Sequence, residues 1–379
     1  MIYLDHNATT PVDPQVVEAM QPFFTQYFGN PSSLSHSLGW QAEAAIEKAR
    51  EQLAIAINAD PVEIIFTSGA TEANNLAIKG VAESYMTSGK HIITVETEHS
   101  AVLEPCRYLE KLGFSVTYLP VQSNGLIEMS ALEKAMRSKT ILVSVMAANN
   151  EIGVLQPIAE IGKLCHEKGV IFHTDAAQAL GKISLDVRTM NIDLMSVTAH
   201  KLYGPKGIGA LYVRRKSPRV RLSPQMHGGG QERGLRSGTL YTPQIIGFGA
   251  AVESAIASQT QEMHRQKELR DRLWQTIQSI PGIHLNGHPT QRLPNNLNVS
   301  IEGVCGADLL SRLRHQIALS SGSACSANKT TPSHVIKALG RSDRLADATL
   351  RFGLGQHTTA EEIEQTALTV IEAVRSLRN

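Results

Sequence analysis

Short runs of apolar and β-branched residues alternate with segments of helical periodicity along most of the chain. The runs that predict β-strands lie at 63–69, 91–100, 114–121, 141–150, 170–178, 193–201 and 208–215. Segments between them, such as 156–169, have the spacing of helices, and this one ends in a glycine after its last lysine. The alternation predicts an α/β fold in which a mostly parallel sheet is flanked by helices on both faces.

The pattern changes beyond about residue 258. A helical segment is followed by shorter strands with helices among them, at 260–280, 296–301, 317–322 and 349–355. A capping box formed by Thr359 and Glu362 opens a last amphipathic helix. We therefore expect a large domain at 13–258 and a smaller α+β domain at 259–379, to which the extended N-terminal residues 1–12 are assigned.

Composition and charge narrow the class of protein. The 379 residues include 36 Lys and Arg against 35 Asp and Glu, a formal net charge of +1, so no global charge favours nucleic acid or an anionic membrane as a partner. Asp5 stands where a signal peptide needs an apolar run, and no stretch approaches the ~18 apolar residues of a membrane span. The four cysteines form no Cys-x-x-Cys pair, and the zinc motif His-Glu-x-x-His is absent from the sequence. We expect a reduced, cytoplasmic, soluble protein without a metal site.

Candidate site residues follow several of the predicted strands. They are Ala70 and Thr71 in a turn that leads into a helix, His99, Asn150, Asp175 with Gln178, and Thr198, His200 and Lys201. Taken singly, each has an ordinary structural explanation, such as a helix cap or a turn. Because the carboxyl ends of parallel strands meet at one edge of a sheet, we expect these residues to lie together.

The most specific chemistry in this set belongs to Lys201. Burial among apolar strands lowers the pKa of a lysine, and the neutral amine can form an imine with an aldehyde. Asp175 ends a buried strand and suits a cationic ring nitrogen, whereas the helix N-terminus that follows the turn at 68–71, with Thr198 and His200, suits a phosphate. The cofactor that requires all three partners is pyridoxal 5'-phosphate.

A separate candidate is Cys325, in the stretch SSGSACSANK at 320–329. Buried cysteines usually behave as small hydrophobic residues, yet this one has only small or polar neighbours. The composition is typical of an exposed loop, and we expect residues 322–332 to be mobile in a substrate-free structure.

The chain resembles the class V (fold-type I) pyridoxal-phosphate enzymes nearly end to end, and among them the cysteine desulfurases of NifS/IscS type, group I. The blocks that carry the resemblance are YLDHNATTPVDP, GNPSSLSH, FTSGATEANNLAIKG, TEHSAV, NNEIG, HTDAAQ, HKLYGPKGIGALY, GGGQERGLRSGT, SSGSACS and LRFGLG. So many ordered blocks are far more specific than any one motif. The resemblance implies a large domain that binds the cofactor and a small domain with a catalytic cysteine loop at about 320–332.

The resemblance also implies roles at the cofactor. Lys201 would bind it as an imine, Asp175 would pair with the pyridine nitrogen, and Gln178 would contact the ring oxygen. His99 would stack on the ring and could move protons. The residues expected to hold the phosphate are Ala70, Thr71, Thr198 and His200, with Thr239 reaching the phosphate of the other subunit in a homodimer.

Further implied roles concern the substrate. Asn150, which would also border the cofactor, and Arg351 would bind the substrate carboxylate, Arg351 as a bidentate fork. Cys325 would accept the sulfur of L-cysteine as a persulfide, leaving L-alanine. An ordinary cysteine has a pKa of ~8.5, so forming the thiolate needs a base, either His99 or the substrate itself.

The physiological sulfur acceptor is left open. An iron–sulfur scaffold, a tRNA-thiolating enzyme or another carrier is compatible with the sequence. Thr198 and Ala199 stand where many relatives have Ser and Gly, a change that keeps the hydroxyl. The chain ends at RSLRN, whereas housekeeping members of the family continue into a tail that contacts the scaffold, so scaffold docking is also open.

Two alternatives compete with a desulfurase. The first is another class V enzyme, namely an aminotransferase, a cysteine/cystine lyase or a selenocysteine lyase. The SSGSAC block argues against an aminotransferase, since transamination needs no cysteine there, but selenocysteine lyase activity is not separable from the sequence. The second is a non-enzymatic module that receives sulfur or binds a partner, for which no bound aldehyde is expected.

Overall fold

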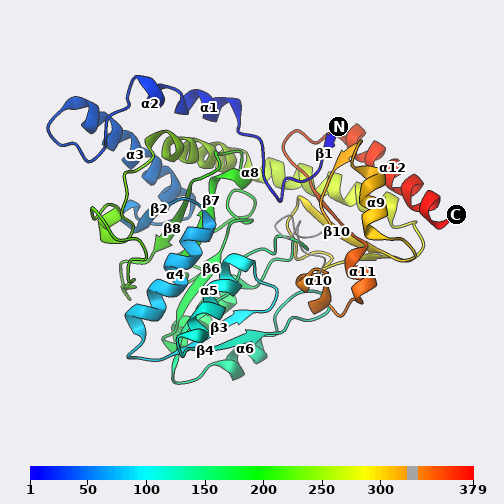
Figure 1. Ribbon diagram of the computed structural model, residues 1–379, viewed down its shortest axis with the longest axis horizontal. Helices are drawn as coiled ribbons and strands as arrows, with labels where there is room; N and C mark the ends of the chain where they lie inside the picture. Colours follow the sequence, from blue (N-terminus) through cyan, green and yellow to red (C-terminus); the bar gives the residue numbers. More distant parts are fainter. Residues whose placement is uncertain (322–331) are drawn as a thin grey trace.

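A seven-stranded sheet forms the centre of the computed structural model, which describes residues 1–321 and 332–379 (Figure 1). Its strands are β2 (Ile64–Thr67), β3 (His91–Val95), β4 (Ser115–Leu119), β5 (Thr140–Ser144), β6 (Ile171–Asp175), β7 (Leu194–Thr198) and β8 (Gly209–Val213). They lie in the order β2-β8-β7-β6-β5-β3-β4. Only β8 runs antiparallel to its neighbours, β2 and β7, and every other pair in this sheet is parallel. The predicted mostly parallel sheet is confirmed.

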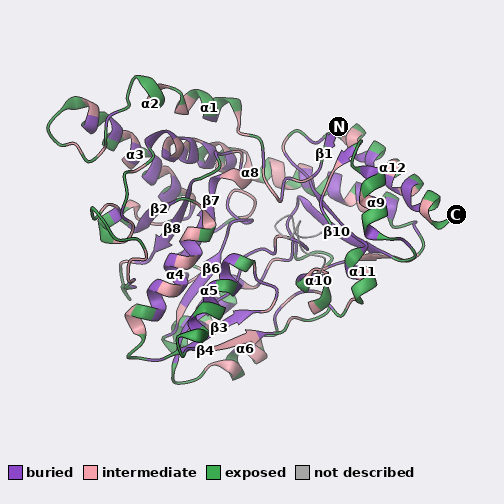
Figure 2. Ribbon diagram, in the orientation of Figure 1, coloured by how far each residue is buried: buried purple, intermediate pink, exposed green. Residues whose placement is uncertain are grey.

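Helices cover both faces of this sheet. They are α3 (Ser37–Ala56), α4 (Ala70–Tyr85), α5 (Ser100–Lys111), α6 (Met129–Ala135), α7 (Ile158–Lys168) and α8 (Thr242–Ile277), preceded by the short α1 (Pro14–Met20) and α2 (Pro22–Thr25). One hydrophobic cluster joins α3, α7 and α8 to one face, and another joins α4 and α5 to the opposite face. Figure 2 shows the resulting pattern, with buried strands between helices whose outer surfaces are exposed. The fold is therefore α/β with helices on both faces, as predicted.

Shorter elements form a second group, on which both chain termini lie (Figure 1). The strands are β9 (Ile283–Leu285), β10 (Asn296–Ile301) and β12 (Thr349–Gly353), which form an antiparallel sheet in the order β12-β10-β9, and β1 (Ile2–Tyr3), which pairs in parallel with β11 (Ile317–Ala318). The helices are α9 (Gly306–Leu313), α10 (His334–Ala338), α11 (Asp343–Asp347) and α12 (Ala360–Arg378). The capping box predicted for Thr359 and Glu362 is present at the start of α12.

Helix α8 spans the border that the sequence pattern suggested. Its N-terminal half contributes Ile245 and Phe248 to the cluster under the main sheet, and its C-terminal half contributes Leu273 and Ile277 to the cluster beneath β10 and β12. The predicted helix at 260–280 is thus the second half of a longer one. Gly249, in the first half, lets α8 pack closely on α3, because a Cβ there would lie 2.3 Å from Gln52 Oε1 and 2.8 Å from Ala49 Cα. The division into domains near residue 258 stays a prediction.

The described part of the chain contains no helix that is both long enough and apolar enough to cross a bilayer.

Candidate active site

A cavity of ≈ 490 Å³ lies at the carboxyl ends of β6 and β7 and the start of α4. Nine of the predicted site residues line it, namely Ala70, Thr71, His99, Asn150, Asp175, Gln178, Thr198, His200 and Lys201. They come from separate segments of the chain between residues 70 and 201, which the sheet brings together as expected from strand order.

One end of the cavity is built for an anion. Helix α4 begins at Ala70 after Gly69, whose φ of 149° is a conformation that side chains rarely adopt and whose lack of a side chain leaves the helix end uncapped. No acceptor for the backbone N–H groups of Ala70, Thr71 and Glu72 occurs among the described residues. Such groups carry the positive end of the helix dipole, so the geometry suits a phosphate.

Thr198 and His200 border the same end. The Thr198 hydroxyl donates to Ile208 O at 3.3 Å, and it would have to rotate to donate to a phosphate. His200 Nδ1 lies 3.1 Å from Thr9 Oγ1. Burial, followed by the positive charges of Lys201, Lys206 and Lys182, lowers the pKa of His200 to about 4, so this imidazole is neutral near pH 7.

Asp175 is held by two donors at the end of β6. Asn74 Nδ2 donates to Oδ2 at 2.7 Å, and the backbone N–H of Ala177 donates to Oδ1 at 2.9 Å. The Asp175 side chain nevertheless lines the cavity while only 6% of the residue is exposed. A fixed carboxylate in this position fits a cationic ring nitrogen.

Gln178 is fixed from behind by side chains that sequence reasoning missed. Its Oε1 accepts from Asn7 Nδ2 at 3.1 Å and from Lys182 Nζ at 3.3 Å, and its Nε2 donates to Asn7 O at 2.8 Å. The second hydrogen of Nε2 has no acceptor within the described ranges. Gln178 can therefore present a donor to a ring oxygen, which fits the predicted role.

Lys201 ends a single 3₁₀ turn, Ala199–Lys201, that follows β7 directly. It lines this cavity and also a smaller one beside α8. The charge of Lys201 contributes to the lowered pKa values of His99 and His200. A lysine, an anchored carboxylate and a helix N-terminus around one cavity are the residues that pyridoxal 5'-phosphate needs, so the site fits this cofactor.

His99 has a defined tautomer in this structure. It caps α5, and its Nδ1 accepts from the backbone N–H of Ala101 at 3.1 Å, so the ring proton of the neutral form is on Nε2. Burial lowers the pKa of His99, the carboxylate of Asp175 opposes this effect, and the charge of Lys201 adds to it. The neutral ring suits stacking on an aromatic cofactor.

Arg351 lies just outside the cavity lining, on β12. Its Nη1 donates to Asn150 O at 2.9 Å, and its Nη2 forms an ion pair with Asp5 Oδ1 at 2.8 Å. Its buried Nε has no partner in the described portion of the chain. Bidentate binding of a substrate carboxylate is thus possible through Nε and Nη2 only if the carboxylate shares or displaces Asp5.

Two predicted residues are not placed at this cavity. Thr239 is exposed in the loop between β8 and α8 and does not line the cavity of its own chain. The structure does not describe residues 322–331. Cys325 and the predicted mobile loop at 322–332 therefore lie outside the described residues, except for Pro332. The roles of both residues stay predictions.

The sequence analysis missed several polar residues that contact the site residues, although the sequence spacing of two of them, Asn74 and Lys182, could have indicated them. Asn74 lies four residues after Ala70, so a helix that presents Ala70 to the cavity also presents Asn74 on nearly the same face. No comparable signal pointed to Asn7 or Asp5, because their contacts join segments far apart in the sequence. Lys182 lies four residues after Gln178, a spacing that could have suggested the contact between their side chains.

Comparison with known proteins places these features in a family. The model of the family described as "Aminotransferase class-V" matches residues 2–366. The chain is 55% identical over 377 residues to "Cysteine desulfurase IscS" of Methylococcus capsulatus, covering 100% of this chain and 93% of that protein. It is 56% identical over 380 residues to "Cysteine desulfurase IscS" of Pectobacterium carotovorum subsp. carotovorum, covering 100% of this chain and 94% of that protein.

Solved structures agree with this grouping. A "NIFS-LIKE PROTEIN" superposes with a TM-score of 0.92 at 38% identity, covering 99% of this chain and 100% of that chain. A structure titled "SspA in complex with cysteine" has a TM-score of 0.83 at 41% identity and covers 95% of this chain and 100% of its own. The match includes both the main sheet and the shorter elements.

Proposed function

This chain belongs to the class V aminotransferase family, and from that premise we propose that it is a cysteine desulfurase, which converts L-cysteine to L-alanine and retains the sulfur as a persulfide. The observation that carries the proposal is the meeting of Lys201, Asp175, Gln178 and the N-terminus of α4 in one cavity, in a chain that aligns end to end with curated desulfurases.

The cofactor of the family, pyridoxal 5'-phosphate, fits this cavity. When bound, it supplies an electron sink that weakens the Cβ–S bond of the substrate. Lys201 would hold its aldehyde carbon, Asp175 would keep the ring nitrogen protonated, and Gln178 would donate to the ring oxygen. The N–H groups at Ala70 and Thr71, with Thr198 and His200, would bind the phosphate.

The substrate carboxylate would be bound on the other side of the cavity. Arg351 offers its buried Nε, which has no hydrogen-bond partner among the described residues, and its Nη1 contact with the backbone of Asn150 holds the guanidinium beside the lining. This arrangement would orient the sulfur of L-cysteine relative to His99, whose neutral ring carries its proton on Nε2 and can donate there. The ring would take a proton at Nδ1 only after releasing the N–H of Ala101.

Cys325 would accept the sulfur. Its thiolate attacks the substrate sulfur, a new S–S bond forms, the Cβ–S bond breaks, and the electron pair remains with the carbon, which is protonated to give alanine. L-cysteine and the Cys325 thiol are thus converted to L-alanine and a Cys325 persulfide without an external oxidant. Support for Cys325 comes from the SSGSACS block in an end-to-end relative of known desulfurases.

We further propose a cytoplasmic homodimer that passes its sulfur to an iron–sulfur scaffold or another acceptor protein. The exposed position of Thr239 would let it reach the phosphate in the partner's site. A reducing compartment suits an enzyme whose product is a persulfide.

The decisive test is intact-mass analysis after incubation with L-cysteine. We expect one extra sulfur atom per chain, removed by reductant, in the wild type and in Cys305→Ala, which lacks an exposed cysteine outside the proposed mechanism. Cys325→Ala should form no adduct and should lose desulfuration. Full-rate desulfuration by Cys325→Ala would refute the role of Cys325, and no adduct on the wild type would refute the mechanism.

Another class V activity is the main alternative. An aminotransferase would convert L-cysteine without releasing sulfur and would not depend on Cys325. A selenocysteine lyase would act far faster on selenocysteine than on cysteine. Measuring alanine and sulfide from both amino acids, with Lys201→Ala as the variant that should lose the visible absorbance band, separates these activities from the proposed one.

A further inference from the structure

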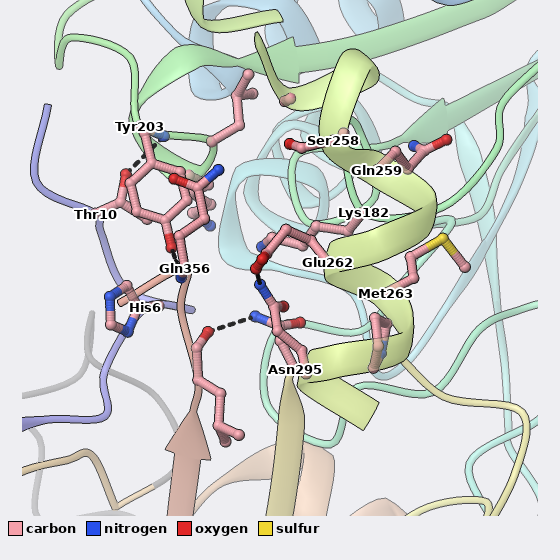
Figure 3. A pocket seen from close by; sticks show the side chains of 17 residues that line it. His6, Thr10, Lys182, Tyr203, Ser258, Gln259, Glu262, Met263, Asn295 and Gln356 are labelled. Carbon is pink, nitrogen blue, oxygen red and sulfur yellow. Dashed lines mark hydrogen bonds between the residues drawn. The ribbon is translucent and has the colours of Figure 1, made fainter. Parts of the chain in front are cut away.

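A second, smaller cavity of ≈ 40 Å³ also has Lys201 in its lining. Figure 3 shows its labelled side chains, which come from the N-terminal arm, the segments after β6 and β7, α8, the residue before β10 and the segment after β12. Among them is Lys182, which follows Gly181 in the turn after β6 and is only partly exposed. The proposed reaction assigns this residue no role.

Lys182 forms no ion pair with a carboxylate throughout residues 1–321 and 332–379. Glu262, the carboxylate in the same lining, accepts from Arg265 Nε at 2.9 Å and from Gln266 Nε2 at 2.8 Å. Burial, followed by the positive charges of Lys201 and Arg351, lowers the pKa of Lys182 to about 7. An amine with little access to water among other cations is costly, so its placement calls for an explanation.

The contacts of Lys182 lead to the cofactor site. Its Nζ donates to Gln178 Oε1 at 3.3 Å, one helical turn back along the chain, and Asn7 Nδ2 donates to the same oxygen at 3.1 Å. Two donors at one oxygen fix which end of the Gln178 amide is oxygen and which is nitrogen. Nε2 then uses one hydrogen for Asn7 O, at 2.8 Å, and directs the other toward no acceptor in the described residues. Gln178 is 3% exposed and lines the main cavity.

We propose that Lys182 is a positioning residue for the proposed reaction: acting through Gln178, it holds the amide so that N–H faces the main cavity and strengthens that N–H as a donor to an anionic oxygen of the cofactor ring. The inference rests on the proposed pyridoxal-phosphate site. Hydrogen bonds in series polarise one another, and a charged donor at one end strengthens the bond at the other. The other charged or titratable groups around Lys182 in the described part of the chain are His6, His200, Lys201, Tyr203, Glu262 and Arg351.

The test measures the pKa of the Lys201 nitrogen from the visible absorbance of the holoenzyme as a function of pH. Weaker donation to the ring oxygen makes that oxygen a better acceptor for the proton on the Lys201 nitrogen, so the pKa should rise in Lys182→Met, by about one unit. The dissociation constant of the cofactor should rise severalfold. Lys163→Met, which removes an exposed lysine on α7, is the control and should change neither quantity.

A second background tests whether the effect passes through Gln178. In Gln178→Leu, the additional substitution Lys182→Met should shift the pKa little, because the connecting amide is gone. If Lys182→Met shifts the pKa of the Lys201 nitrogen equally in the wild type and in Gln178→Leu, the charge of Lys182 acts directly and not through Gln178, and the proposal is overturned. If Lys182→Met does not fold, Lys182→Gln, which retains a neutral donor, should give a smaller shift in the same direction.

Failure of this inference is distinct from failure of the proposed function. A wild-type holoenzyme that has the visible band, but whose Lys201 pKa is unchanged by Lys182→Met, would overturn only the role of Lys182. A wild-type protein that forms no visible band with pyridoxal 5'-phosphate would overturn the proposed function, and this inference with it.

Discussion

The wall of the main cavity formed by the sheet differs from the wall on the side of the N-terminal arm, where Ala8 and Thr9 line the cavity and Arg351 of β12 lies just outside the lining. On the sheet wall, Asp175 ends β6 and Lys201 closes the turn that follows β7, and the pairing of these neighbouring strands fixes the relative positions of the two residues. On the other wall, Arg351 is paired with Asp5, 346 positions away, and Gln178 with Asn7, 171 positions away. The first wall depends on strand order, and the second on the docking of a terminal segment.

This difference separates two requirements of the site. The sheet wall presents a lysine and a carboxylate held by a backbone N–H and a buried amide, which suits the fixed demands of a cofactor. The arm wall contains an ion pair with a partly exposed carboxylate, Asp5, whose contact with Arg351 can be exchanged for another anion. Four substitutions test the comparison, in decreasing order of expected effect.

The largest effect is expected on the sheet wall. Asp175→Asn keeps the shape but removes the charge that would keep the ring nitrogen protonated, so desulfuration should fall by about 100-fold or more. Steady-state kinetics at saturating L-cysteine, with cofactor content measured from absorbance, gives the result. Asp347→Asn, at an exposed position on α11, is the control. A loss below about threefold in Asp175→Asn would contradict the counter-ion role.

On the arm wall, Arg351→Lys should act on substrate binding. Lysine cannot make the planar bidentate contact, so the KM for L-cysteine should rise about 10-fold or more, with a smaller change in kcat. The measurement is the separate determination of kcat and KM. A loss confined to kcat would show that Arg351 does not bind the ground-state carboxylate.

Asp5→Asn should change the same quantity in the opposite direction. Without the charge of Asp5, Arg351 has no competing ion pair, so the KM for L-cysteine should fall severalfold. The cofactor absorbance should not change, since Asp5 does not line the main cavity. A raised KM would show instead that Asp5 orients the guanidinium for the substrate.

The smallest effect concerns Glu98, which is fully buried beside the sheet wall. Burial raises its pKa well above the ordinary range, although Oε1 accepts from the backbone N–H of Met146 at 2.6 Å. A raised pKa stabilises the fold at pH values below the ordinary carboxyl pKa, and this contribution is lost as pH rises through the folded value. Glu98→Gln removes that dependence. The difference in melting temperature, variant minus wild type, should therefore increase as the pH rises from about 5 to about 9.

The magnitude expected for Glu98→Gln is about 1–2 kcal/mol at the alkaline end. Glu104→Gln, an exposed carboxylate on α5, is the matched control and should show no such trend. If the difference in melting temperature between Glu98→Gln and wild type does not change with pH, Glu98 is ionised in the folded protein across this range.

The same comparison explains what could be predicted from sequence. Asp175 and Lys201 were predicted because they follow buried strands, and strand order alone brings such positions together. The convergence of nine candidate residues at one cavity followed from that rule. The ion pair of Arg351 with Asp5 and the contact of Gln178 with Asn7 could not be predicted, since they depend on where the N-terminal arm docks.

The early start of α8 was missed for a different reason. Gly247 and Gly249 lower helix propensity, so the sequence around them favours a later start. In the structure they permit close contact, because a Cβ on Gly247 would lie 2.5 Å from Met20 Sδ and one on Gly249 2.8 Å from Ala49 Cα. Packing against α1 and α3 outweighed local propensity.

The length of α8 has a consequence for how the molecule unfolds. Its 36 residues extend about 54 Å as one uninterrupted helix, and both the cluster under the main sheet and the cluster under β10 and β12 bury part of it. Loss of either cluster exposes apolar residues on half of that helix and removes packing that holds its other half in register. Melting of the two clusters should therefore be energetically coupled, so that calorimetry of the cofactor-free chain shows one cooperative transition rather than two.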